Sequence, residues 1–168
     1  QEPQFLDENG IYIWDALDVK CCNILADHPY YYYKLLAQRP RNYCQLSIDK
    51  NHEKFMRRFF PEIEMGPFLP LGGTQIDHPT LKKMPERSMD VVFTGNYASP
   101  SRFEKYITRL GDEYTAFYYE MIDALLADPS QTVEEVVERF LRREIPEVTE
   151  EQLKETMQNI TFIDLYVR

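Results

Sequence analysis

Three short apolar runs alternate with amphipathic segments in the first half of the chain, and this alternation constrains the fold more than any other feature. The runs occupy residues 20–26, 43–48 and 66–70, and helix-like segments at 30–38 and 51–60 lie between them. Parallel strands need a long connection, usually a helix, so this order is typical of a parallel sheet. The pattern predicts an α/β fold with a Rossmann-like parallel sheet and crossover helices, preceded by a helix over residues 5–17.

The chain beyond Pro100 has the spacing of helices. Apolar side chains recur every three or four positions, which predicts a buried stripe that Gly111 breaks or kinks. Thr132 and Thr149 are each followed three residues later by Glu or Gln, so two capping boxes predict two further helices. The residues expected to pack this helical half are Phe103, Ile107, Leu110, Tyr114, Phe117, Met121, Leu125, Val137, Phe140 and Leu141.

The composition shifts near residue 80. Residues 77–90 contain two prolines and mixed charge without apolar periodicity, so residues 81–89 are predicted to link a first unit, 1–80, to a second, 90–168. Residues 90–95 predict a buried strand that opens the second unit. A lone strand cannot satisfy its own backbone groups, so it joins the first sheet or pairs with strands beyond Arg168. The apolar run at 162–167 is an odd natural end, which favours an internal fragment of a longer protein.

Charge and cysteine content narrow the partners. Of the net charge of −9, residues 86–168 hold −8, and a chain this acidic repels the phosphates of nucleic acid. The three cysteines lack metal-ligand spacing, and Cys21 and Cys22 are read as reduced thiols in a buried strand. No apolar stretch approaches the roughly 20 residues of a membrane span. We expect a cytoplasmic protein without a metal site or a cofactor.

Polar or glycine turns follow each of the three apolar runs. The carboxyl ends of parallel strands meet at one sheet edge, where ligands bind, so we expect a shared cleft. Its residues are Asp27, His28, Asp49, Asn51, His52, Gly72 and Gly73. His28 and its neighbour Asp27 are the candidate catalytic residues, His28 because imidazole suits proton transfer near neutral pH. The alternative is structural: an Asp before a helix is often only a cap, and His28 then orders the turn.

A second candidate site precedes the helices of the second half. Gly95, Asn96 and Arg102 stand between an expected strand and an expected helix, where backbone N–H groups can bind a donor phosphate. The alternative is a plain turn capped by Ser99 or Ser101. The basic residues Lys54, Arg57 and Arg58 are read as a solvated helix face.

Five segments, read in order, resemble the bacterial spore-maturation-protein-like glycosyltransferases, whose N-terminal domain has no known function. They are ILADHPYYYYKLL at 24–36, SIDKNHEKFMRRFFPEIE at 47–64, PFLPLGG at 67–73, DVVFTGNY at 90–97 and FIDLYVR at 162–168. The resemblance covers nearly the whole chain. It implies two facing Rossmann-like domains, the GT-B arrangement, which usually needs no metal.

The resemblance implies that residues 1–80 are the later part of an acceptor-side domain and that residues 90–168 open the donor-side domain. The donor would be a nucleotide sugar, the acceptor is unknown, and the fragment alone would be inactive because the second domain is incomplete. The alternative is a non-catalytic α/β binding or protein-interaction module, with self-association through the helical half. The high aromatic content fits a large core and equally a sugar-binding or partner-binding surface.

Overall fold

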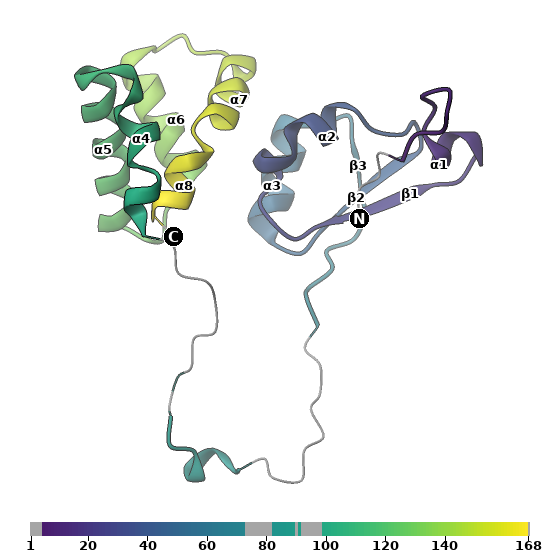
Figure 1. Ribbon diagram of the computed structural model, residues 1–168, viewed down its shortest axis with the longest axis horizontal. Helices are drawn as coiled ribbons and strands as arrows, with labels where there is room; N and C mark the ends of the chain where they lie inside the picture. Colours follow the sequence, from purple (N-terminus) through teal and green to yellow (C-terminus); the bar gives the residue numbers. More distant parts are fainter. Residues whose placement is uncertain (1–4, 73–81, 90, 92–98, 168) are drawn as a thin grey trace.

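The computed structural model in Figure 1 describes residues 5–72, 82–89, 91 and 99–167. It is a mixed α/β structure with two parts. The sheet part, residues 5–72, holds a small three-stranded parallel sheet and its helices, and the helical part, residues 99–167, holds only helices. A bilayer-spanning helix is absent from the described residues, since none of their helices combines the required length with the required apolarity.

The sheet has the order β1-β2-β3, and both strand pairs are parallel. Its elements are β1 (Cys21–Leu25), the 3-10 helix η1 (Pro29–Tyr32), α2 (Tyr33–Ala37), β2 (Tyr43–Ser47), α3 (Lys50–Phe59) and β3 (Glu64–Met65). The predicted parallel sheet with crossover helices is therefore confirmed. The third strand lies earlier than the predicted residues 66–70. The chain nevertheless continues beside β2, because the N–H groups of Gly66 and Leu69 donate to the carbonyls of Gln45 and Ser47.

The predicted helix over residues 5–17 is wrong, because only α1 (Ile13–Ala16) is helical. Residues before it form a turn, closed by an antiparallel bridge between Leu6 and Tyr12. Asp7 accepts the N–H groups of Asn9 and Ile11, and Gly10 adopts a φ of 75°. Side-chain bonding of this kind competes with a helix, and the apolar spacing alone could not reveal it.

One face of the sheet is covered and the other is open at β1. Cys21, Asn23 and Leu25 are buried, whereas the alternate residues Cys22 and Ile24 are exposed. Met56 and Phe59 of α3 lie in the same buried core as Cys21 and Leu25. The two adjacent cysteines are both free thiols, but only Cys21 is buried, which corrects the expectation that both lie in a buried environment.

The second part is helical, as predicted. It consists of η3 (Pro100–Arg102), α4 (Glu104–Ile107), η4 (Thr108–Leu110), α5 (Asp112–Ala127), α6 (Val133–Glu144), α7 (Glu150–Asn159) and α8 (Thr161–Val167). Both predicted capping boxes are present, at Thr132 with Glu135 and at Thr149 with Gln152. Each box satisfies two N–H groups at a helix start, and this explains why α6 and α7 begin where they do.

The buried stripe of the helical part is largely as predicted, with two exceptions. Ile107, Met121 and Val137 are buried, and so are Leu125 and Phe140, while Phe117 and Leu141 pack partly buried against the same core. Leu110 and Tyr114 are exposed, Leu110 by 51%. The predicted break at Gly111 is present. Gly111, at a φ of 96°, ends η4 and restarts the chain as α5, so residues on either side of it no longer share a face.

The two parts pack against each other. Buried residues of both belong to one hydrophobic cluster, and α7 contacts η1. The ammonium group of Lys154 lies 4.0 Å from the ring centre of Phe60. Residues 82–89, within the predicted linker, are exposed and hold one 3-10 turn, η2 (Met84–Glu86). Of the predicted strand at 90–95, only Val91 is described, and it is exposed; the others lie outside the described residues.

Candidate functional site

A cavity of about 410 Å³ lies between the sheet part and the helical part. The sheet part lines it with the turns that follow β1 and β2, at the carboxyl edge of the sheet, where ligands bind in open parallel sheets. The helical part lines it with the end of α5, the α5–α6 connection, the start of α6, and α8. The cavity is therefore lined by residues within 28–52 of the first half of the chain and within 125–167 of the second half.

Four of the residues predicted for a shared cleft line this cavity: His28, Asp49, Asn51 and His52. Asp27 does not line it. Its carboxylate is exposed and accepts the Tyr32 hydroxyl at 2.9 Å, so it orders the chain after β1.

The other predicted site residues are not brought to the cavity within the described part of the chain. Gly72 is exposed and is not among the residues that line it. Arg102 is exposed on η3, where its N–H donates to the Ser99 carbonyl. Gly73, Gly95 and Asn96 lie outside the described residues.

His28 is buried, with 7% of its surface exposed, and both ring nitrogens are engaged. It caps η1: Nδ1 accepts the N–H of Tyr30 at 3.4 Å, and Pro29 occupies the first position of the helix. Because Nδ1 is an acceptor, the proton belongs on Nε2, which makes a close polar contact with the carboxylate of Glu134. The ring stacks on Tyr30 with 3.8 Å between centroids. His28 thus joins the two parts.

Glu134 was not among the residues that the sequence pointed to. It lies in the first turn of α6, with 14% of its side chain exposed, and lines the cavity. Burial raises the pKa of its carboxyl, but the hydrogen bonds that it accepts, first of all from His28, outweigh burial, so the pKa lies below its ordinary value. The carboxylate is therefore ionised at neutral pH. The capping box marks Glu135, but no local signal marks Glu134, because the partner of Glu134 is His28, more than a hundred residues away.

A second buried carboxylate reaches the cavity from α8. Asp164 is buried and accepts the hydroxyl of Tyr31 at 2.7 Å. Beside it, burial raises the pKa of Tyr30 far above its ordinary value, and the negative charge of Asp164 adds to this effect. The sequence showed Asp164 only as an interruption in an apolar run. A charged residue among apolar neighbours at a helix start was the available signal, since such residues are rarely buried unless paired.

Asp49 and His52 belong to the start of α3. Asp49 caps this helix, accepting the N–H of Asn51 at 2.6 Å, which is the structural alternative stated above. The residue is exposed and also lines the cavity, so the cap does not remove it from the site. The ring of His52 meets that of His28 edge to face, with 4.8 Å between centroids.

The cavity is acidic. Asp49, Glu134 and Asp164 line it together with two imidazoles, and none of its described lining residues is Lys or Arg. No group of His, Cys, Asp or Glu among the described residues is arranged to hold a metal ion. Carboxylates, imidazoles, and the amides of Asn51 and Gln131 bind hydroxyl and amino groups readily.

The chain matches no family model, no curated protein and no solved structure. The resemblance to glycosyltransferases therefore remains a prediction, and the cavity is the observation from which a function can be argued.

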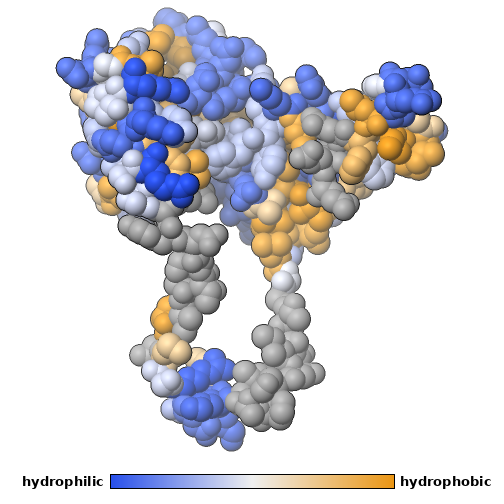
Figure 2. All heavy atoms as spheres, viewed as in Figure 1, coloured by the Kyte–Doolittle hydropathy of each residue, from blue (hydrophilic) through white to orange (hydrophobic). Residues whose placement is uncertain are grey.

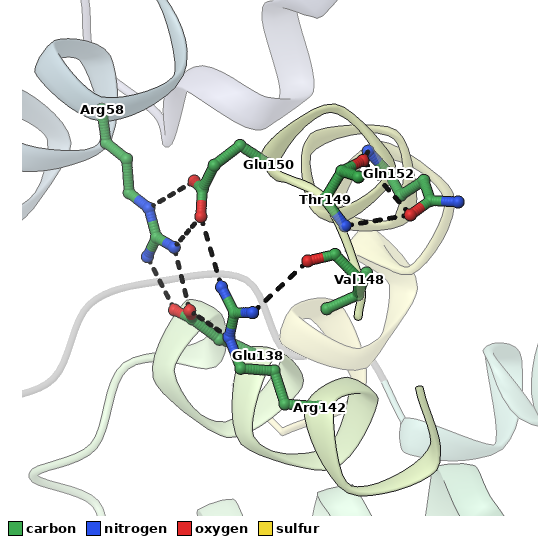
Figure 3. Close-up of polar contacts among 7 residues, drawn as sticks. All are labelled: Arg58, Glu138, Arg142, Val148, Thr149, Glu150 and Gln152. Carbon is green, nitrogen blue, oxygen red and sulfur yellow. Dashed lines mark hydrogen bonds and ion pairs between the residues drawn. The ribbon is translucent and has the colours of Figure 1, made fainter. Parts of the chain in front are cut away.

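An ion-pair network beside the cavity holds the two parts together (Figure 3). Arg58 of α3 binds Glu138 of α6 at 2.6 Å and Glu150 of α7 at 2.9 Å, and Arg142 bridges the same two carboxylates. Hydrogen bonds from Arg58 lower the pKa of Glu138 to about 2, with a further contribution from Arg142. Lys54, Arg57 and Arg58 are exposed, as predicted, but the spacing could not show that Arg58 also pairs with glutamates of distant helices.

Proposed function

We propose that residues 1–80 belong to the acceptor-side domain of a glycosyltransferase, that residues 90–168 open its donor-side domain, and that the cavity between the two parts holds the acceptor. The observation that carries the proposal is the position and chemistry of the cavity: it lies at the carboxyl edge of a parallel sheet and is lined by carboxylates, imidazoles and amides. Such groups recognise the hydroxyls of a sugar or a sugar-like acceptor. The sheet with its crossover helices is what a Rossmann-like domain would contribute.

A donor diphosphate calls for positive charge, and the described lining of the cavity has no Lys or Arg. We therefore place the nucleotide-sugar donor on a second domain, with Gly95, Asn96 and Arg102 as its candidate contacts. Residues 1–168 alone are then expected to transfer no sugar. A cytoplasmic location fits this proposal, because a nucleotide sugar is the donor and Cys21, Cys22 and Cys44 are free thiols.

For the general base we propose His52 in addition to the sequence candidate His28. A base needs a lone pair that faces the acceptor hydroxyl, and His28 uses Nδ1 to cap η1 and Nε2 to contact Glu134. These contacts favour the reading in which His28 orders the turn and positions the ring of His52. His52 lies in the first turn of α3, is only partly buried and lines the cavity.

The test uses the full-length protein and a panel of nucleotide sugars, with release of the nucleotide as the readout. His52→Ala is expected to lower kcat by about 10²–10⁴-fold with little change in Tm. His28→Ala is expected to lower Tm and activity together. Arg57→Ala is the matched control, because Arg57 lies on the same helix but pairs with Glu53 and does not line the cavity. Absence of release from every donor, or full activity in both histidine variants, would refute the proposal.

The second candidate function is a non-catalytic interaction module. One observation favours it: apolar side chains of the sheet part are exposed around α1 and β1, at the right of Figure 2. They are Phe5, Leu6, Ile11, Ile13, Leu17, Val19 and Ile24. In the helical part, by contrast, Tyr118, Phe140 and Phe162 are buried in the core, which leaves less aromatic surface for the expected self-association. A stable complex that Leu17→Glu abolishes, together with no nucleotide release, would favour the module.

A further inference from the structure

The charge of the cavity restricts the ligand that it can hold. Asp49, Glu134 and Asp164 reach it from the α3 cap, α6 and α8, and the two histidines His28 and His52 are the only side chains in its described lining that can become positive. Lys54 and Arg58 line an adjoining cavity of about 140 Å³ that shares Asn51, Thr132 and Glu134 with the larger one, and Arg58 is already bound to two glutamates. Three carboxylates and no Lys or Arg belong to the described lining, so the cavity should repel a phosphate or carboxylate and attract an ammonium group.

Tyr30 adds a second, independent observation. It is 4% exposed and lines the cavity, and its hydroxyl lies within reach of Asp164 and Tyr31 without making a well-aligned hydrogen bond to a described residue. Asp164 lies near enough to raise the pKa of Tyr30, so the hydroxyl stays protonated. A buried hydroxyl whose hydrogen bonds are poorly aligned gains free energy from a well-placed ligand oxygen. The site therefore offers a polar group as well as charge.

We propose that the cavity binds a polyhydroxylated ligand that carries an amino group, of the amino-sugar class, and that it rejects phosphorylated and carboxylated ligands. The inference rests on the proposed function, because it names the acceptor class of the same site. The carboxylates of Asp49 and Glu134 attract the ammonium group, and the Tyr30 hydroxyl and the amides bind ligand hydroxyls.

The experiment titrates the full chain with three probes that share one ring: glucose, glucosamine and glucose 6-phosphate. Binding is followed by NMR through the imidazole resonances of His28 and His52. Glucosamine is expected to bind about two- to fivefold more tightly than glucose, the range set by partly exposed ion pairs. Glucose 6-phosphate is expected to leave both resonances unmoved. The advantage of glucosamine should shrink as salt is added.

The variant Asp49→Asn tests the effect of the negative charge without disturbing the helix cap. Asn caps a helix about as well as Asp, so α3 should keep its start while the cavity loses one negative charge. The ratio of glucosamine to glucose affinity should fall toward one. Asp7→Asn is the matched control, since Asp7 also accepts backbone N–H groups but does not line the cavity. Its ratio should equal that of the wild type.

Three results would overturn the inference: binding of glucose 6-phosphate as tight as that of glucosamine, an unchanged affinity ratio in Asp49→Asn, or no movement of either imidazole with any probe. Nucleotide release by the full-length protein is scored separately. Amino-sugar binding without release from any donor contradicts the proposed transferase, whereas release without an amine preference contradicts only the ligand class.

Discussion

The contact between His28 and Glu134 should contribute measurably to the stability of the protein, because it is buried and joins the two parts. His28 is 7% exposed and the Glu134 side chain 14%. Glu134→Ala removes the carboxylate and leaves the Nε2–H of His28 buried without its partner. An unsatisfied buried polar group costs about 1–3 kcal/mol, and the free energy of unfolding should fall by about this amount.

The assay is urea denaturation of the wild type, Glu134→Ala, His28→Ala and the double variant. Residues in direct contact show coupling energies of about 0.5–3 kcal/mol in such a cycle, and we expect a value in this range. Glu113→Ala is the control for the general effect of an acidic residue at a helix start, because Glu113 occupies the first turn of α5 and is exposed. A coupling energy near zero, with Glu134→Ala no worse than Glu113→Ala, would refute the reasoning.

The same pair predicts a pH dependence. The pKa of Glu134 in the folded state lies below its ordinary value of 4.5, so the unfolded chain binds the proton more readily. The contribution is present above pH 4.5 and is lost as the pH falls through the lower folded-state pKa. The stability difference between the wild type and Glu134→Gln should therefore narrow in acid. A difference that stays constant from pH 7 to pH 3 would contradict this assignment.

Three further predictions concern stability. Phe140→Ala should destabilise the protein by roughly 3–5 kcal/mol, because the ring of this α6 residue is buried and packs against Phe117 of α5. An unchanged Tm would show that the stripe is a surface. Arg58→Ala should lower the free energy of unfolding by about 1 kcal/mol, and by less in high salt. Arg58→Lys should not restore this stability, because only a guanidinium group can bind Glu138 and Glu150 at the same time through its several N–H groups. Full recovery of stability in Arg58→Lys would contradict this. Gly111→Ala should lower stability by about 1–2 kcal/mol because of the positive φ alone, since no atom lies within 4 Å of an added Cβ. Gly72→Ala is the control: its surroundings are equally open and its φ is not positive, so its thermal unfolding should be nearly unchanged.

The sequence by itself determined the features that depend on neighbouring residues. The apolar runs at 20–26 and 43–48 became β1 and β2, and the capping boxes at Thr132 and Thr149 opened α6 and α7. Strand alternation, helix caps and glycine breaks all act over a few residues, so their signals are local. The polar turns after β1 and β2 also indicated where His28, Asp49, Asn51 and His52 would meet, because parallel strands direct their carboxyl ends to one edge.

Only the tertiary structure decided which distant groups complete the cavity. Tyr31 and Asp164 are 133 positions apart, and Arg58 binds glutamates 80 and 92 positions away, so no spacing rule connects them. Leu110 was predicted to be buried but is exposed, because its position depends on how the chain turns at Gly111. Burial and ion pairing depend on how the helices and the sheet pack. That packing joins residues that are far apart in the sequence, so no sequence pattern reveals it. Glu134 therefore looks like an ordinary helix-start residue in the sequence, and it becomes the partner of His28 only when α6 closes over the edge of the sheet.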